Sequence, residues 1–400
     1  MKKIKVVHIV PMLNPGGAER VAVHLATGMN REKYEPAVIS LMGRMDCELD
    51  RDLDAAGVEV RYLGKHLGFD YRMYSRVSRT LRELRADIIH THLQVLRYVF
   101  PCAAFLKQRS LVHTVHNLAE REIEPSMRWL QGYALRHGVV PVAVADAVAS
   151  SLRRTYGIPK CGVIANCIPT GCYARPKITR NEWRARVGFG EDDVLFVCVA
   201  RFAPQKNHSM LLKAFAEGAA ANQNAHLVLI GDGALREQLE QEAVRLRISA
   251  QTHFLGLRTD IPESLGAADV FVLSSDFEGN PLSVMEAMAS GLPIVSTEVG
   301  GVPALFENYK QGLLVRAGDV LGLSTAMVFL LENKVTRRNL GVAAARRAKD
   351  KFDVSLMVDS YENLYDQILA RARRMRPETY PCEDRGTGRA DAPGSKLATL

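Results

Sequence analysis

The stretch Ser275-Asp276-Phe277-Glu278-Gly279-Asn280-Pro281-Leu282-Ser283-Val284-Met285-Glu286-Ala287-Met288-Ala289-Ser290-Gly291 gives the clearest structural signal in the chain. It follows an apolar, β-branched run at 269–274, which predicts a buried strand. Asn280 is a favourable N-cap and Pro281 suits the first helical position, so a helix is expected to begin there and to end before Gly291. A buried strand that leads through a loop into an apolar helix is the repeating unit of a parallel α/β sheet.

The same alternation of short strands and helical segments continues along most of the chain. Strands are expected at 4–10, 37–41, 58–62, 87–91, 111–115, 140–145 and 162–165, and then at 194–200, 226–231, 252–256, 269–274, 293–296 and 312–316. The segment from Pro169 to Lys177 has no periodicity and is interpreted as a linker. The sequence therefore predicts an α/β protein with two doubly wound, Rossmann-like domains at residues 1–172 and 173–354.

Two further regions follow these domains. A helix is expected at 355–376, and residues 377–400 are polar, aperiodic and expected to be disordered. No repeat of fixed short period occurs, which argues against solenoids and propellers.

Composition and charge narrow the class of protein. The chain has 400 residues, 47% hydrophobic and 24% charged, as in a soluble globular protein. Its excess of +8 lies wholly in residues 1–172, which hold 24 Lys and Arg against 16 Asp and Glu; residues 173–400 hold 28 of each. Nucleic acid or an anionic membrane surface would both suit such a charge distribution. Nucleic acid is disfavoured because no zinc-finger spacing and no aromatic RNA-binding motif is present.

The sequence shows no targeting segment and no cysteine motif. No apolar run approaches the roughly 20 residues that a spanning helix needs, and the run after Met1-Lys2-Lys3 fits a first strand better than a signal peptide, so a cytoplasmic protein is expected. The seven cysteines form no CxxC pair, which indicates neither a zinc ribbon nor a disulfide framework.

A glycine loop follows the first strand in Asn14-Pro15-Gly16-Gly17-Ala18-Glu19-Arg20. Gly16 and Gly17 let the backbone approach a ligand, and the following helix start offers N–H groups to a phosphate or a sugar oxygen. A tight turn without a ligand is the alternative. Neither GxGxxG nor a P-loop motif is present, which argues against an ordinary dinucleotide fold and a P-loop nucleotidase.

A basic loop follows the first strand of the second domain. Arg201 and Lys206 flank a turn that contains Pro204, and at a strand end they can converge on the two phosphates of a nucleotide diphosphate. A solvated basic loop is the alternative interpretation.

Two carboxylates in the stretch 275–291 complete the candidate site. Glu278 precedes the helix and Glu286 lies inside it, so both face one crevice only if the loop bends back over the helix start. Carboxylates accept hydrogen bonds from vicinal hydroxyls, which suits a ribose and a hexose on either side of a diphosphate. The helix start, from Gly279 and Asn280 to Leu282 and Ser283, would meet the phosphates. Alternatively, Glu286 is a structural salt-bridge residue.

Together, Arg201 with Lys206, Glu278 with Glu286, the Gly16-Gly17-Ala18-Glu19 loop and the Gly231-Asp232-Gly233 turn resemble glycosyltransferase family 4, of the GT-B fold, over about residues 4–370. The resemblance implies two domains that face each other across a cleft and a final helix that packs back towards the first domain. It also implies sugar transfer with retention, from a UDP- or GDP-linked donor held mainly by the second domain to a saccharide or lipid-linked acceptor held by the first. No metal is required on this reading.

The resemblance assigns roles to further residues. Arg201 and Lys206 would neutralise the leaving diphosphate, Glu286 would hold the ribose, and Glu278 would contact the donor sugar. His116 matches the family position near the donor sugar, although a strand-end histidine is more often structural, and Leu257 with Arg258 would border the base. Because Lys206 is expected to face solvent, its replacement by alanine should leave the fold unchanged.

The sequence differs from the family pattern at two places, and it contains one motif that resembles a metal site. Cys167 follows Asn166 where the family usually has glycine, and Ala145-Asp146 stands where serine is common. Residues 50–54 contain DxD twice, but they fall in an expected surface helix and are interpreted as solvated charge rather than a metal site.

A basic helix marks the acceptor side. Arginines recur at steps of three and four at Arg72, Arg76, Arg79, Arg82 and Arg85, which predicts one basic face. Such a face either is solvated or docks on anionic lipid at the inner face of the cytoplasmic membrane.

The reading that the sequence favours is a transferase in cell-surface polysaccharide or glycolipid synthesis. A nucleotide-sugar epimerase or a phosphorylase on the same architecture, and an inactive nucleotide-sugar binding partner, are the alternatives.

Overall fold

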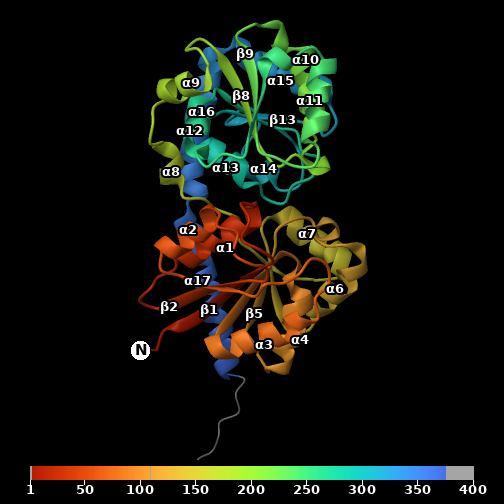
Figure 1. The fold of residues 1–400 in the computed structure, drawn as a ribbon, viewed down its shortest axis with the longest axis vertical. Helices are drawn as coiled ribbons and strands as arrows, with labels where there is room; N and C mark the ends of the chain where they lie inside the picture. The colour runs from red at the N-terminus through yellow and green to blue at the C-terminus, as the bar shows by residue number, and fades with distance from the viewer. Residues whose placement is uncertain (1, 109, 375–400) are drawn as a thin grey trace, which may run out of the picture.

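The computed structural model describes residues 2–108 and 110–374, which form two α/β units placed one above the other (Figure 1). The first domain is built on β1 (Ile4–Val10), β2 (Tyr34–Ser40), β3 (Glu59–Tyr62), β4 (Ile88–His92), β5 (Leu111–Val115), β6 (Val139–Ala143) and β7 (Gly162–Val163). The second is built on β8 (Val194–Val199), β9 (Ala225–Ile230), β10 (Thr252–Gly256), β11 (Val270–Leu273), β12 (Ile294–Thr297) and β13 (Gly312–Val315). Each expected strand is confirmed, with ends shifted by at most three residues.

Helices cover both sheets. They are α1 (Gly17–Gly28), α2 (Glu48–Ala55), α3 (Arg72–Leu84), α4 (Leu96–Phe105), α5 (Ala119–Glu122), α6 (Arg128–Arg136), α7 (Asp146–Tyr156), α8 (Thr170–Ala174), α9 (Arg180–Val187), α10 (His208–Glu217), α11 (Arg236–Arg245), α12 (Ile261–Ala267), α13 (Leu282–Ala289), α14 (Val302–Leu305), α15 (Val320–Glu332), α16 (Lys334–Lys351) and α17 (Val354–Arg374). Short 3-10 turns lie at η1 (Leu93–Val95), η2 (Pro125–Met127), η3 (Pro204–Lys206), η4 (Ala219–Ala221) and η5 (Ser249–Gln251).

Strand order confirms two doubly wound sheets. The first sheet runs β3-β2-β1-β4-β5-β6-β7 and the second β10-β9-β8-β11-β12-β13, and neighbouring strands pair in parallel. The order reverses between β1 and β4 and again between β8 and β11. Ligands bind open α/β sheets outside the carboxyl ends of the strands at such reversals. The loops after these four strands are therefore where a site is expected.

Two local expectations are wrong. The segment after Pro169 is not wholly irregular, because it contains the short helix α8. Helix α13 begins at Leu282, with Pro281 as its N-cap in extended conformation, rather than with Asn280 as the cap. The Asn280 side chain is used elsewhere: its Oδ1 accepts the backbone N–H of Asn166 at 3.0 Å.

The last described helix, α17, packs along the first domain (Figure 1). Its Tyr365 hydroxyl lies 2.6 Å from His90 Nδ1, and its Tyr361 hydroxyl lies 2.7 Å from Thr114 Oγ1. The Asp366 carboxylate accepts a hydrogen bond of 3.0 Å from Tyr34. Helix α17, at the C-terminal end of the described chain, therefore completes the buried polar core of the first domain. The predicted disordered tail, 377–400, lies outside the described residues.

Within residues 2–108 and 110–374, no helix combines the length and the apolar character needed to cross a bilayer. The exact boundary between the domains at 172/173 stays a prediction.

Candidate active site

The carboxyl ends of the two sheets face each other across a cleft. Leu118, Glu120 and Arg121 of the first domain and Pro204, Gln205, Asp276 and Phe277 of the second line a hollow at its mouth. Deeper in, Gly279 abuts the backbone after β5, because a Cβ atom placed on Gly279 would lie 2.0 Å from the carbonyl oxygen of His116. The loop before α13, which contains Gly279, thus packs directly on the first domain.

Lys206 and Glu278 form the polar centre on the second domain. Lys206 Nζ lies 2.6 Å from Glu278 Oε1, which also accepts the Ser275 hydroxyl at 2.6 Å. The expectation that Lys206 faces solvent is wrong: its side chain is 19% exposed and that of Glu278 is 6% exposed. Folding brings together two residues predicted to share the cleft because both follow the carboxyl ends of neighbouring strands, β8 and β11.

Glu286 is tied to the first domain. Its Oε1 accepts Arg20 Nη1 at 3.2 Å, and Arg20 Nη2 lies 3.6 Å from Glu48. Burial and the Glu286 carboxylate hold the pKa of Tyr173 well above its ordinary value. Arg20 therefore anchors this buried carboxylate to the opposite domain by an ion pair.

The glycine loop of the first domain also lies in the cleft. A Cβ atom on Gly17 would sit 3.9 Å from Leu282 at the start of α13, so the two helix starts approach each other. Burial raises the pKa of Glu19 to about 7, and the charge of Arg201 partly offsets that rise. Glu19 and the exposed Arg201 thus interact electrostatically across the cleft, and Glu19 folds back over Gly16, where a Cβ would meet its carboxylate at 2.4 Å.

Close backbone contacts explain two further predicted positions. Gly231 has φ +141, and a Cβ there would lie 2.0 Å from the Ala200 carbonyl, so only glycine fits beside the Arg201 loop. Asn166 donates its side-chain Nδ2 to the Asn280 carbonyl at 2.9 Å. The glycine that the family usually has at 167 is not needed for backbone reasons, since Cys167 is not among the described residues with positive φ.

Three remaining expectations concern Leu257 with Arg258, Ser283, and the DxD segment at 50–54. Arg258 pairs with Asp260 at 2.6 Å and lies over the Trp183 ring, and Leu257 is 75% exposed. That Leu257 and Arg258 border the base stays a prediction, as does the contact of Ser283 with the phosphates. In the DxD segment, Asp50 is not solvated: it is fully buried, and it accepts the Cys47 N–H at 3.0 Å and the Tyr62 hydroxyl at 2.5 Å. It is a structural cap of α2.

His116 begins a chain of buried imidazoles. Its Nε2 lies 3.0 Å from His92 Nδ1, and His92 Nε2 lies 3.2 Å from His8 Nδ1. Burial lowers the pKa of His116 to about 3, so the ring is neutral near pH 7. Neutral imidazoles donate from one nitrogen and accept at the other, which suits such a chain. At its ends, His116 Nδ1 and His8 Nε2 have no partner among the described residues.

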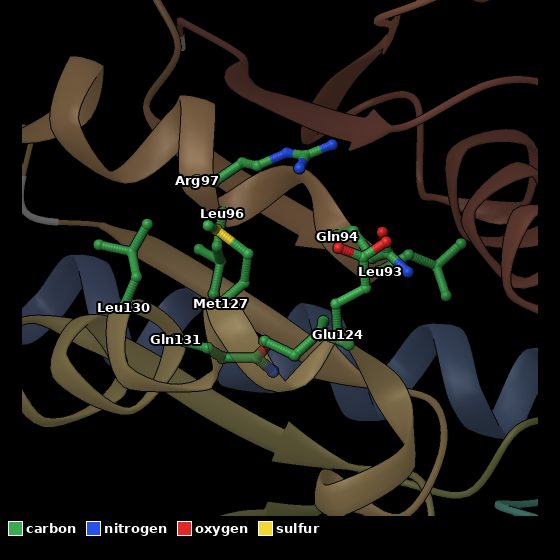
Figure 2. A pocket seen from close by; sticks show the side chains of 9 residues that line it. Leu93, Gln94, Leu96, Arg97, Glu124, Met127, Leu130 and Gln131 are labelled. Carbon is green, nitrogen blue, oxygen red and sulfur yellow. The ribbon is translucent and has the colours of Figure 1, made fainter. Parts of the chain in front are cut away.

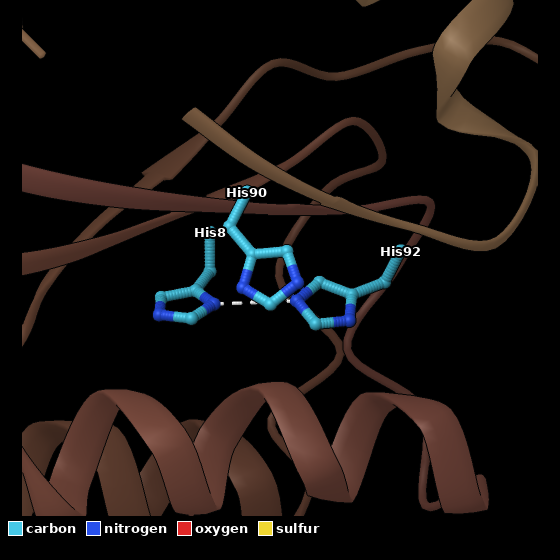
Figure 3. A group of neighbouring side chains, drawn as sticks. All are labelled: His8, His90 and His92. Carbon is cyan, nitrogen blue, oxygen red and sulfur yellow. Dashed lines mark hydrogen bonds between the residues drawn. The ribbon is translucent and has the colours of Figure 1, made fainter. Parts of the chain in front are cut away.

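Figure 3 shows the rings of His8, His90 and His92 side by side. Their ring nitrogens lie within 4.8 Å of one another. Both nitrogens of His90 are engaged, Nδ1 with Tyr365 at 2.6 Å and Nε2 with Thr114 at 2.7 Å. A metal ion could be held by all three rings only if one of these hydrogen bonds were lost. The trio is better described as part of a hydrogen-bond network.

Glu122 holds the backbone at His116 by a hydrogen bond. It accepts the His116 backbone N–H at 2.9 Å and the Gln131 side chain at 2.8 Å, and burial raises its pKa to about 7. Arg20, Tyr173, His92 and Glu122 were not predicted as site residues. Arg20 carried a usable signal, since it lies one helical turn after Gly17 on the same face of α1.

Comparison with known proteins agrees with this arrangement. The family model described as "Glycosyltransferase Family 4" matches residues 15–171, and "Glycosyl transferases group 1" matches residues 179–347. The Escherichia coli protein UDP-Gal:alpha-D-GlcNAc-diphosphoundecaprenol alpha-1,3-galactosyltransferase is 26% identical, over 92% of this chain and 98% of its own length. N-acetyl-alpha-D-glucosaminyl L-malate synthase of Bacillus anthracis is 26% identical, over 75% of this chain and 80% of its own.

Solved structures share the fold. Anabaena HepE in complex with UDP and glucose superposes with a TM-score of 0.81 at 21% identity, covering 91% of this chain and 100% of that one. WaaG, a glycosyltransferase involved in lipopolysaccharide biosynthesis, superposes with a TM-score of 0.71 at 17% identity, covering 91% and 99%.

Two facing parallel sheets with polar side chains gathered in the cleft between them are the GT-B fold that these structures share. With both halves matched by family models, the chain belongs to glycosyltransferase family 4.

Proposed function

We propose that the chain transfers a hexosyl group, with retention, from a UDP- or GDP-linked donor to a saccharide or lipid-linked acceptor in cell-surface polysaccharide or glycolipid synthesis. The observation that carries the proposal is the Lys206–Glu278 pair, 2.6 Å apart in the cleft. It offers a cation to a diphosphate and, beside it, a carboxylate to sugar hydroxyls. The family membership and the relatives' acceptors support the same reading.

The cations act on the leaving group. When the bond between sugar and diphosphate breaks, negative charge builds up on the departing phosphate oxygens. Lys206 and Arg201 would neutralise that charge in a site already arranged for it. Because Lys206 is held by Glu278 beforehand, little reorganisation is needed when the donor arrives.

The two carboxylates divide the donor between them. Glu286, oriented by Arg20, is proposed to hold the ribose, and Glu278 the donor sugar. Glu286→Gln should then weaken UDP or GDP binding itself, whereas Glu278→Gln should spare nucleotide binding and impair transfer. Equal effects of both variants on nucleotide affinity would contradict this division.

The first test is thermal stabilisation of the purified protein by UDP, GDP, ADP and their sugar conjugates, without added metal. Binding to the folded state alone raises the melting temperature by mass action. A shift with one diphosphate series identifies the base and supports binding without a metal ion. The absence of a shift with all of them would count against the proposed donor site.

Contact of the first domain with an anionic membrane surface at the inner face of the cytoplasmic membrane is the second part of the proposal. Arg72, Arg79 and Arg82 of α3 are exposed, and the loop before them exposes Leu67 (89%) and Phe69 (66%). Exposed cations beside exposed apolar side chains suit anionic lipid.

Arg76 does not belong to this face. It is half-buried and donates from Nη1 to the Leu63 carbonyl at 2.5 Å, so it anchors the loop. Sedimentation with phosphatidylglycerol vesicles should therefore fall in a variant carrying Arg72→Glu and Arg79→Glu and persist in Arg338→Glu, which alters an exposed arginine of α16. Unchanged sedimentation of the double variant would refute the membrane contact.

A further inference from the structure

Three imidazoles of the first domain lie end to end and reach the cleft through His116. His8 belongs to β1, His92 ends β4, and His116 directly follows β5, so the imidazole chain crosses three neighbouring strands of the sheet. His8 and His92 are fully buried, whereas His116 is only partly buried. The backbone of Gly279, from the second domain, lies against the His116 carbonyl oxygen. His116 is therefore the end of the imidazole chain that lies at the cleft.

The three rings are neutral near pH 7. Burial lowers the pKa of His8 and of His116 to about 3. Burial and then the neighbouring imidazoles, His90 first, hold the pKa of His92 well below its ordinary value. A neutral imidazole carries one proton on one of its two nitrogens, so each ring donates one hydrogen bond and accepts one.

The two contacts between the rings leave a single choice for the protons. His8 Nδ1 lies 3.2 Å from His92 Nε2, and His92 Nδ1 lies 3.0 Å from His116 Nε2. Each contact takes one proton, so the third proton of the imidazole chain lies on a terminal nitrogen, either His116 Nδ1 or His8 Nε2. The end that carries the proton is a donor, and the opposite end is a bare acceptor.

The buried end decides between these two arrangements. His8 Nε2 has no hydrogen-bond partner in the described part of the chain. An N–H group without an acceptor is rarer in protein interiors than an acceptor without a donor. A proton on His8 Nε2 would bury such an N–H group, whereas a proton on His116 Nδ1 finds an acceptor when a ligand enters the cleft. The favoured arrangement therefore has His8 Nδ1 donating to His92 and His92 Nδ1 donating to His116.

The ring of His92 is held in place by a second network. Its centre lies 4.2 Å from the centre of the His90 ring. His90 is itself fixed through both nitrogens, by the Tyr365 hydroxyl at 2.6 Å and the Thr114 hydroxyl at 2.7 Å. Leu93, the next residue, has φ +56, a left-handed conformation that marks a position fixed by its surroundings. The direction in which His92 Nδ1 points is thus set by the fold.

The backbone segments beside the cleft end are packed together as well. Leu93 and Gln94, which follow His92, and Glu124, which follows shortly after Glu122, line one small pocket, and Figure 2 shows them at one end of it. Glu122 in turn accepts the His116 backbone N–H at 2.9 Å. The segments that carry His92 and the partner of His116 therefore do not move independently.

We propose that His92, with His8 behind it, is a positioning residue that fixes His116 as a hydrogen-bond donor through Nδ1. That N–H group donates to an oxygen of the donor sugar, and the His92 N–H group holds His116 in the tautomer that can do so. The inference rests on the proposed function, because it takes the donor sugar to lie beside His116. Without His92, the His116 ring is free to adopt either tautomer.

The first experiment locates the proton directly. The full chain is labelled with ¹⁵N-histidine, and long-range proton–nitrogen correlation NMR without ligand shows which nitrogen of each ring is protonated. The signals of His116 and His92 are identified by their loss in His116→Gln and His92→Asn. The proposal expects the proton on Nδ1 in both rings. A proton on Nε2 of His116 would overturn it, whatever reaction the protein catalyses.

Two variants of nearly equal size then separate positioning from packing. In His92→Asn the side-chain amide can still donate to His116 Nε2, whereas His92→Leu has no donor. The assay is release of UDP or GDP from the sugar conjugate that gives the largest melting shift. His92→Leu should lower kcat/KM at least about tenfold, the value of one hydrogen bond to the substrate, and His92→Asn should recover most of that loss. His137→Leu, which changes an exposed histidine just after α6, is the control and should match the wild type.

Each failure has its own signature. Equal losses of kcat/KM in His92→Asn and His92→Leu would show that His92 acts through packing alone and would overturn the proposal. The melting shift with UDP or GDP should be the same in the wild type and both variants, because Arg201 and Lys206 lie on the second domain. Absence of that shift in the wild type would count against the proposed function, and the NMR result would still uphold or overturn the tautomer of His116.

Discussion

Replacing Gly279 with alanine tests whether the observed contact between the domains belongs to the reacting state. The added Cβ would lie 2.0 Å from the His116 carbonyl oxygen and 2.9 Å from its carbon. Gly279 is not among the residues with positive φ, so alanine brings no backbone strain of its own. The effect of Gly279→Ala is therefore steric, and it falls on the opposite domain.

The magnitude follows from the geometry. Relieving the clash requires the two backbones to separate by about 1 Å, since close-packed atoms do not tolerate such an overlap. The two hydrogen bonds between Asn166 and Asn280, at 3.0 and 2.9 Å, would then be overstretched. At about 1 kcal/mol each, their loss removes about 2 kcal/mol from the arrangement in which the two domains touch at Gly279, or roughly 30-fold in the population of that arrangement. A displacement of 1 Å at reacting groups costs about 100-fold in rate.

We therefore expect kcat/KM for release of UDP or GDP from the donor to fall by about 30- to 100-fold. Nucleotide affinity should fall much less, because Arg201 and Lys206 lie on the second domain alone. Gly171→Ala in α8 is the control, since a Cβ there meets no atom within 4 Å. A Gly279→Ala enzyme with wild-type kcat/KM would show that the contact with His116 is absent when the reaction occurs.

Three further predictions concern stability. Lys206→Ala should lower the free energy of unfolding in urea by roughly 2 kcal/mol, because it leaves the buried Glu278 without its cation. Adding Glu278→Gln should recover most of that stability but no activity. Additive losses of stability in the double variant would be inconsistent with a coupled pair. Burial lowers the pKa of His8, His113 and His116 of the first domain to about 3, so the stability that each contributes is present above pH 6.5 and is lost as the pH falls, at roughly 2 kcal/mol each by pH 5. Fluorescence of Trp129 in the first domain should then report unfolding at a higher pH than that of the buried Trp183 in the second, and simultaneous transitions would argue against this. Burial raises the pKa of Glu122 from 4.5 to about 7, so the folded state binds its proton more tightly and stability falls as the pH rises through that window; Glu122→Gln should flatten this slope, and an unaltered slope would exclude Glu122 as its source.

The fold could be read from the sequence because burial and strand period are local signals. Lys206 and Glu278, 72 residues apart, were predicted to share a cleft because the carboxyl ends of parallel strands meet at one edge. The pairing of Arg20 with Glu286 spans 266 residues and two domains, and no local pattern encodes it. The N-cap of α13 was misplaced for a similar reason, because the Asn280 side chain is taken by Asn166 from the other domain. Asp50 looked solvated because its Tyr62 partner comes from a neighbouring strand.

The position of α17 has a consequence for biosynthesis. The ribosome delivers β1–β7 long before it delivers Tyr361 and Tyr365, which hydrogen-bond to Thr114 and His90 in the core of that sheet. Domains usually fold in the order in which they emerge. Here the nascent first sheet must wait, with polar groups unsatisfied, until the second domain has been synthesised. Chaperone occupancy on translating ribosomes should accordingly persist on the first half of the chain until α17 emerges.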